Sequence, residues 1–199
     1  DCSYPFDELS GCGVGFKLVQ AYCQKNGIPF QQIEPLLDLL AVSIASDIVP
    51  LVDENRILAH YGLLRLNASP SKGLLSIIKI CGLDRHNITI DDIVFKIGPR
   101  INAAGRMRID ENDENAAPSG GYAAVNLLIE GNESLAEEFG SVIDGFNQDR
   151  KCIDRSVTQE AHDFIEAHAE LKAAKSTVIY NPRWMKGIVG IVASRLIET

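Results

Sequence analysis

An aspartate at the end of an apolar segment is the first residue whose chemistry needs an explanation. Asp47 follows a run that covers nearly the whole circumference of a helix, so the helix is predicted to be buried. The apolar residues are Leu36, Leu37, Leu39, Leu40, Val42 and Ile44. A carboxylate in that position must be paired, hydrogen-bonded or bound to a cation. Two interpretations stay open: Asp47 is a metal ligand, or it caps the turn over residues 48–50.

A segment of small residues further along the chain carries two arginines and an asparagine. The segment is Gly98-Pro-Arg-Ile-Asn-Ala-Ala-Gly-Arg-Met107, and its glycines and proline predict a loop. Small residues let a polyanion approach the backbone, while Arg100 and Arg106 offer bidentate phosphate contacts and Asn102 adds an amide. Phosphate binding is one interpretation. The other is that the arginines pair with the acidic residues at 110–114.

A glycine-rich helix start near residue 187 is the third candidate. Residues 176–180 predict a strand, 181–187 a loop and 188–198 a helix, whose first-turn N–H groups could bind an anion. Gly187, Gly190 and Ala193 fall three apart, and Ser194 and Arg195 follow them. Tight helix packing explains the same spacing, and from these residues alone it is the favoured interpretation.

The elements that must position these residues are mainly helices. Helices are predicted over 16–26, 36–46, 55–66, 74–81 and 122–130, and a long one over 134–168 with a break near Gly140 or Gly145 as an option. Residues 108–121 predict a surface loop. The long helix indicates a connection between two lobes, and the strand and helix after it indicate the start of a second domain. The predicted fold class is α/β.

The composition indicates a protein that folds in water. The 199 residues are 46% hydrophobic and 23% charged, which excludes a disordered chain and a collagen-like repeat. No apolar run reaches about 18 residues, which argues against a membrane protein. The net charge of −8 argues against a simple basic nucleic-acid-binding module, but not against a nuclease that binds metal ions. Five scattered cysteines predict reduced thiols in a cytoplasmic protein, and the four histidines do not cluster as metal ligands would.

Taken together and in order, these motifs resemble those of the RecJ family of exonucleases, within the DHH phosphoesterase superfamily. The matching segments are 4–6, 9–17, 45–51, 55–56, 98–107, Asn147 with Arg150, and 187–196. The string Pro-Arg-x-Asn-Ala-Ala-Gly-Arg at 99–106 and the glycine-rich helix start carry most of the specificity.

The resemblance also implies a division of the chain. Residues 1–130 would be the C-terminal part of a DHH phosphoesterase domain, 131–172 a long connecting helix, and 173–199 the first strand and helix of a DHH-associated domain. The family's other metal-binding motifs, including its Asp-His-His triplet, are not in the sequence, and Met185 stands where the family commonly has histidine. We therefore expect a central segment of a longer protein, without appreciable nuclease activity by itself.

The activity that the resemblance implies is hydrolysis of single-stranded DNA from the 5′ end, in DNA repair and recombination, with Mn²⁺ or Mg²⁺ in a two-metal site. Asp47 would be a catalytic residue and one of several metal ligands. The DNA-contacting residues would be Arg100, Asn102, Arg106, Gly187, Gly190, Ser194 and Arg195. A single-stranded-DNA-binding protein and a helicase would be partners. The alternatives are a phosphoesterase for short oligonucleotides or cyclic dinucleotides, and a catalytically dead DNA-binding or replication-scaffold homologue.

Overall fold

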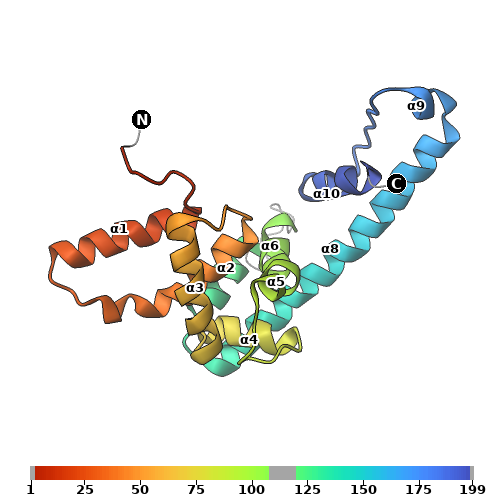
Figure 1. The fold of residues 1–199 in the computed structure, drawn as a ribbon. Coiled ribbons are helices and arrows are strands. Elements are labelled where there is room, and N and C mark those ends of the chain that lie inside the picture. The colour runs from red at the N-terminus through yellow and green to blue at the C-terminus, as the bar shows by residue number, and fades with distance from the viewer. Residues whose placement is uncertain (1–2, 108–119, 198–199) are drawn as a thin grey trace.

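The computed structural model describes residues 3–107 and 120–197, and its ordered elements there are helices (Figure 1). The α-helices are α1 (Gly11–Lys25), α2 (Leu37–Ser46), α3 (Asp53–Ala68), α4 (Lys72–Ile80), α5 (Ile90–Asp92), α6 (Gly98–Arg106), α7 (Gly120–Ile129), α8 (Glu133–Ala167), α9 (Ala169–Ala173) and α10 (Lys186–Ile197). Two 3₁₀ turns, η1 (Phe30–Gln32) and η2 (Glu34–Leu36), precede α2, and a π-helical turn, η3 (Ile93–Ile97), precedes α6. None of the helices described is both long and apolar enough to cross a membrane.

Helix α2 lies inside the bundle because apolar residues cover its circumference. Leu40, Ala41 and Ile44 are fully buried. One face of α2 joins a core with α1 and α3, and the other joins the larger core formed with α3, α4, η3, α6, α7 and α8. The predicted buried helix is therefore confirmed, and its rigid end carries Asp47.

Several helix ends follow the expected local chemistry. Ser10 Oγ accepts the Gly13 N–H at 3.1 Å where α1 begins, and Asn132 Oδ1 accepts the Leu135 N–H at 3.2 Å where α8 begins. Gly27 and Gly82 have φ of 65°, just after α1 and α4, a conformation that glycine adopts without steric cost. The helices predicted over 16–26 and 74–81 end directly before these two glycines.

The loop predicted over 98–107 is wrong, because residues 98–106 form helix α6. This helix continues from α5 and η3, and the Gly98 N–H donates to the Ile93 carbonyl five residues back. The wide π turn precedes Pro99, which has no N–H to donate and whose ring disturbs a regular preceding turn. Ala103 and Ala104 are buried in α6 and favour the helical state.

The strand predicted over 176–180 is also wrong. Val178 and Tyr180 are 85% and 83% exposed, and the segment has no regular structure. A strand needs a neighbouring strand to pair its backbone groups, and residues 3–107 and 120–197 contain none. The α/β assignment is therefore not confirmed, and this part of the chain is helical. Of the predicted loop at 108–121, residues 108–119 lie outside the description and the last two begin α7.

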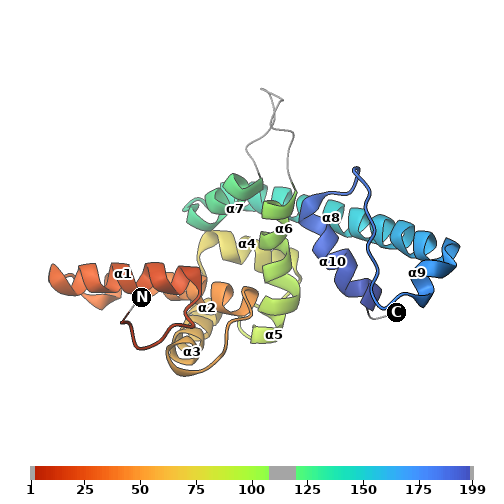
Figure 2. The same cartoon turned by 90° about the horizontal axis from the view of Figure 1, so that it is seen from above.

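The long helix is confirmed, and neither Gly140 nor Gly145 breaks it, since α8 runs for 35 residues. It leaves the bundle, and the chain returns through α9 to place α10 beside α8 and α6 (Figures 1 and 2). Ile188 and Val192 of α10 form a small apolar cluster with Val157 and Ala161 of α8. This return brings the glycine-rich helix start next to the arginine-bearing segment.

Candidate functional site

Asp47 ends α2 with its carboxylate exposed. Its Oδ2 accepts a hydrogen bond from Ser43 Oγ at 3.1 Å, one turn back in the same helix. Ser43 Oγ also lies 3.1 Å from Ser10 Oγ, the residue that caps α1. The hydrogen bond that the structure records for this carboxylate is therefore to α2 itself and not to the turn over 48–50.

The start of α6 packs against the same end of α2. A Cβ placed on Gly98 would lie 2.5 Å from Ser46 Oγ, so a larger residue would push the two helices apart. The chain leaves α2 through Ile48 at φ 54°, a left-handed conformation that is unfavourable for a β-branched residue. Helix α6 consequently begins close to Asp47.

The surroundings of Asp47 provide one ligand suited to a hard divalent cation. Mn²⁺ and Mg²⁺ prefer carboxylate oxygens. The nearby Cys12 thiol is a poor ligand for them, because partial desolvation, and then the charge of Asp47, raise its pKa. Within the described ranges, no three His, Cys, Asp or Glu side chains gather in a way that could hold a metal ion. Asp47 by itself therefore fits the role of one ligand and does not form a metal site.

Helix α6 separates its polar residues onto two faces. The Arg100 guanidinium faces α8, where its Nε donates to Asp144 Oδ1 at 2.8 Å, and its Nη1 donates to the Lys96 carbonyl at 2.9 Å. Asn102 and Arg106 are one turn apart on the exposed side. The two arginines thus stand in different environments. The acidic residues 110–114, which were the predicted alternative partners, lie outside the described residues.

The end of α6 meets the first turn of α10. Arg106 Nη1 donates to the Gly187 carbonyl at 3.2 Å, and a Cβ on Gly187 would lie 2.5 Å from the Arg106 carbonyl oxygen. At Gly190, in contrast, a Cβ would meet no atom within 4 Å. The structure therefore brings two of the predicted motifs together, with Gly187 serving close packing and Gly190 lying open.

The first turn of α10 offers fewer free amides than the sequence predicted. The N–H groups of Ile188 and Val189 donate to the Met185 carbonyl, at 3.0 and 3.3 Å. Ser194 is exposed, and its Oγ donates to the Gly190 carbonyl at 3.1 Å. The donors best placed to meet an anion at this end are consequently cationic side chains.

A stripe of polar residues on α8 lies beside the same junction, and its acidic member was missed by the sequence analysis. The stripe consists of Asn147, Arg150, Asp154 and Thr158, spaced three or four apart on one face. Among the residues described, five of its buried polar atoms have no hydrogen-bond partner: Asn147 Nδ2, Arg150 Nε, Asp154 Oδ1 and Oδ2, and Thr158 Oγ1. A charged residue in register with the buried Val157 and Ala161 is the sequence signal that would have revealed Asp154.

Three arginines share this region. Arg195 Nη2 lies 2.8 Å from Asp154 Oδ2, within ion-pair distance although not in hydrogen-bond alignment. Burial lowers the pKa of the Arg150 guanidinium, the charge of Asp154 opposes that shift, and the charges of Arg106 and Arg195 add to it. Arg106 and Arg195 are therefore each close enough to repel Arg150, and Asp154 offsets part of this repulsion.

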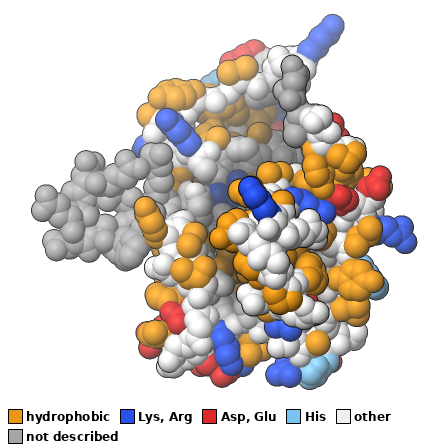
Figure 3. All heavy atoms as spheres, turned by 90° about the vertical axis from the view of Figure 1, so that its left-hand side faces the viewer, with side chains coloured by type: hydrophobic (Ala, Val, Ile, Leu, Met, Phe, Trp, Pro, Cys, Tyr) orange, Lys and Arg blue, Asp and Glu red, His pale blue; other side chains and the backbone are white. Residues whose placement is uncertain are grey.

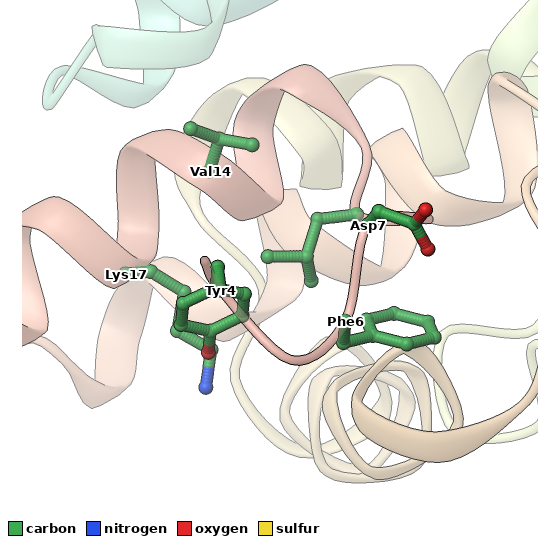
Figure 4. Close-up of a pocket in the computed structure, with 6 residues that line it drawn as sticks. Tyr4, Phe6, Asp7, Val14 and Lys17 are labelled. Carbon is green, nitrogen blue, oxygen red and sulfur yellow. The ribbon is translucent and has the colours of Figure 1, made fainter. Parts of the chain in front are cut away.

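A separate cavity of about 340 Å³ opens between the N-terminal segment and α1 (Figure 4). Its lining residues are Tyr4, Phe6, Asp7, Leu9, Val14 and Lys17. Tyr4 Oη donates to Glu54, whose Oε2 also lies 3.1 Å from Lys17 Nζ. On the molecular face toward which α1 points, exposed hydrophobic side chains are interspersed with lysine and arginine (Figure 3). The cavity is mainly apolar, and we assign it no part in the chemistry.

Comparison with known proteins gives a consistent result. No protein-family model matches the chain. The single-stranded-DNA-specific exonuclease RecJ of Bacillus subtilis is 38% identical over 197 residues, which are 99% of this chain and 23% of that protein. RecJ of Escherichia coli is 32% identical over 213 residues, covering 100% of this chain and 34% of that protein. The chain is RecJ-like along its whole length.

The similarity to RecJ includes the fold. A crystal structure of RecJ with Mn²⁺ from Thermus thermophilus superposes with a TM-score of 0.78 at 27% identity, over 96% of this chain and 26% of that one. A structure of exonuclease RecJ bound to manganese gives 0.79 at 28% identity, over 98% and 46%. The resemblance inferred from the motifs is confirmed. The chain spans about a quarter to a third of the length of these curated RecJ relatives.

Proposed function

We propose that this chain is a central segment of a RecJ-type exonuclease that removes nucleotides from single-stranded DNA, starting at the 5′ end, in DNA repair and recombination. The observation that carries the proposal is the position of α6. This helix begins beside Ser46, the residue before Asp47, and ends with Arg106 against Gly187. Its nine residues span about 13 Å at about 1.5 Å per residue. A single DNA strand is long enough to reach a candidate metal ligand and a cluster of arginines at once.

On this proposal, Asp47 is a catalytic ligand in a two-metal site for Mn²⁺ or Mg²⁺, whose other ligands come from chain outside these 199 residues. The RecJ structures with Mn²⁺ and Mg²⁺ support this choice of ion. Two divalent ions in such a site activate water and stabilise the attacking and leaving oxygens of the phosphodiester. Asp47 suits the role because its carboxylate is exposed while the helix behind it is buried.

The DNA phosphates are proposed to lie over the exposed face of α6 and over α10. Arg106 and Asn102 would donate to phosphate oxygens from α6, and Arg195 would donate from α10. The open backbone at Gly190, together with the Ser194 hydroxyl, would let the strand approach α10 closely. Two further members of the predicted set would act by positioning these groups: Gly187 lets α10 approach Arg106, and Arg100 ties α6 to Asp144.

The domain division is proposed on the same basis. Residues 1–130 would complete the phosphoesterase domain, 131–172 would connect the lobes, and 173–199 would begin the DHH-associated domain. The path of α8, which leaves the bundle and is followed by the return of α10, supports a connecting role (Figure 1). A helicase and a single-stranded-DNA-binding protein are proposed partners, because the substrate is a single strand.

The test is an exonuclease assay on the full-length protein that contains this chain. We expect Mn²⁺-dependent release of nucleotides from a 5′-phosphorylated single strand, little release from a blunt duplex, and none by the 199-residue chain alone. Preferential hydrolysis of dinucleotides or cyclic dinucleotides would favour the short-substrate alternative. DNA binding without hydrolysis under any divalent metal ion would favour the scaffold alternative. Either outcome would contradict the proposal.

A further inference from the structure

The acidic residue beneath the arginine cluster has a role that neither the motifs nor the comparisons assign. Asp154 is 0% exposed, on the face of α8 that packs against α10. It stands one turn before the buried Val157, beside the apolar cluster that holds α10 in place. Removing a carboxylate from water in such surroundings carries a large desolvation penalty, which a nearby cation offsets. A buried carboxylate at this position therefore needs a cationic side chain close to it.

This cation is Arg195, whose guanidinium lies between the buried acid and the surface. Its Nη2 is 2.8 Å from Asp154 Oδ2, while 46% of the side chain stays exposed. A guanidinium has five N–H donors in a fixed plane, so one edge can face the carboxylate while the other faces solvent. The charge of the same carboxylate also raises the pKa of Arg150, one turn earlier on α8, whose Nη2 donates to Asn147 Oδ1 at 3.2 Å.

We propose that Asp154 is a positioning residue, which holds the Arg195 guanidinium in place so that its outer edge meets a DNA phosphate beside Arg106. The inference rests on the proposed function and deepens it. Arg106 and Arg195 both repel Arg150, and without Asp154 the partly exposed Arg195 side chain swings away from the cluster.

On this proposal, neutralising Asp154 changes the affinity for DNA in the direction opposite to the one expected from charge alone. Neutralising an acidic residue near a DNA-binding surface normally strengthens DNA binding, because the local potential becomes more positive. If Asp154 instead orients Arg195, then Asp154→Asn weakens binding although it removes a negative charge. A merely structural role would change the stability of the fold without this loss of affinity at temperatures where the protein stays folded.

The experiment measures the affinity of the full-length protein for a 5′-phosphorylated single-stranded oligonucleotide in EDTA, by fluorescence anisotropy at several salt concentrations. We expect Asp154→Asn to weaken binding about tenfold and to reduce the salt slope by about 0.7, as for the loss of one phosphate contact to a single strand. The control is Asp149→Asn, which makes the same charge change at an exposed position of α8 and should bind at least as tightly as the wild type. Wild-type or tighter binding by Asp154→Asn would overturn the proposal.

Two further comparisons strengthen the test, and the second, Arg195→Lys, stays decisive if Asp154→Asn folds poorly. Adding Asp154→Asn to Arg195→Ala should cause no further loss of affinity, and additive losses would contradict action through Arg195. Arg195→Lys changes only a surface side chain, and a lysine that faces Asp154 has no second edge for a phosphate. It should therefore bind nearly as weakly as Arg195→Ala, and wild-type affinity would refute the bridging role. Failure of the wild-type protein to bind the strand at all would instead refute the proposed function.

Discussion

The two ends of α6 are built in opposite ways. At the Asp47 end, the candidate functional side chain is exposed, and the helix that carries it is anchored by fully buried residues such as Leu40 and Ile44. At the Arg106 end, polar side chains of α8 are buried beneath the junction, and α10 is held by a small apolar cluster together with polar contacts from Arg106 and Asp154. A metal ligand must keep its geometry within narrow limits, whereas charge attracts a phosphate over a longer range. The rigid end therefore suits chemistry, and the adjustable end suits binding.

Loss of Asp47 gives the largest expected effect and tests the rigid end. Asp47→Ala should lower Mn²⁺-dependent hydrolysis by the full-length protein roughly a hundredfold or more, because a metal ligand is removed. The exposed side chain contributes little packing, so the unfolding midpoint should stay unchanged. Ser43→Ala, which removes the donor to Asp47 Oδ2 and the contact with Ser10 Oγ but keeps the carboxylate, should cause a smaller loss. Wild-type turnover by Asp47→Ala would remove this residue from the site.

A methyl group at the α6–α10 contact tests how the adjustable end is held. In Gly187→Ala the new Cβ would meet the Arg106 carbonyl at 2.5 Å, so the helices must separate, at a cost of about 1–3 kcal/mol. The matched control is Gly190→Ala, which has open space and should stabilise α10 by up to about 1 kcal/mol. Chemical denaturation of both variants measures the difference. Equal stabilities would show that the close contact does not hold α10 in place.

The two arginines of α6 separate binding from packing. Arg106→Ala should reduce the salt slope for single-stranded DNA by about 0.7, because one phosphate contact is lost. Arg100→Ala should leave that slope unchanged and lower stability by about 1 kcal/mol, since it breaks the pair with Asp144. Salt titrations of DNA binding and denaturation curves distinguish the two. A reduced slope for Arg100→Ala would place this arginine among the phosphate ligands.

The smallest expected effect concerns the turn after Asp47. Ile48 has φ 54°, which costs a β-branched residue about 1–2 kcal/mol. Ile48→Gly removes that strain but adds flexibility to the unfolded chain, worth about 0.5–1 kcal/mol. The net result should be a stabilisation of up to about 1 kcal/mol in thermal unfolding. A destabilised variant would show that packing of the Ile48 side chain outweighs the strain.

Local signals in the sequence predicted the buried helix before Asp47, the helix ends at Gly27 and Gly82, and the long helix α8. They failed where distant partners decide the structure. The π turn before Pro99 belongs to a helix that packs in the core. The glycines and proline of residues 98–107 therefore wrongly predicted a loop. Residues 176–180 have the composition of a strand but no strand to pair with in the described ranges.

The candidate site shows the same limit. Asp47, Arg106 and the start of α10 could be singled out from residue type and spacing. The sequence did not show that Arg100 pairs with Asp144, nor that Asp154 lies beneath Arg195, because each pair joins different helices. Such contacts depend on how α8 lies against α6 and α10.

The most direct test of this division between the ends of α6 compares Asp47→Ala with Arg106→Ala in one assay. The hydrolysis rate of the full-length protein is measured with Mn²⁺ across a range of concentrations of a 5′-phosphorylated single strand. We predict that Asp47→Ala loses the rate at saturating DNA, whereas Arg106→Ala mainly raises the DNA concentration needed for half of the maximal rate. Loss of the same quantity in both variants would contradict the account.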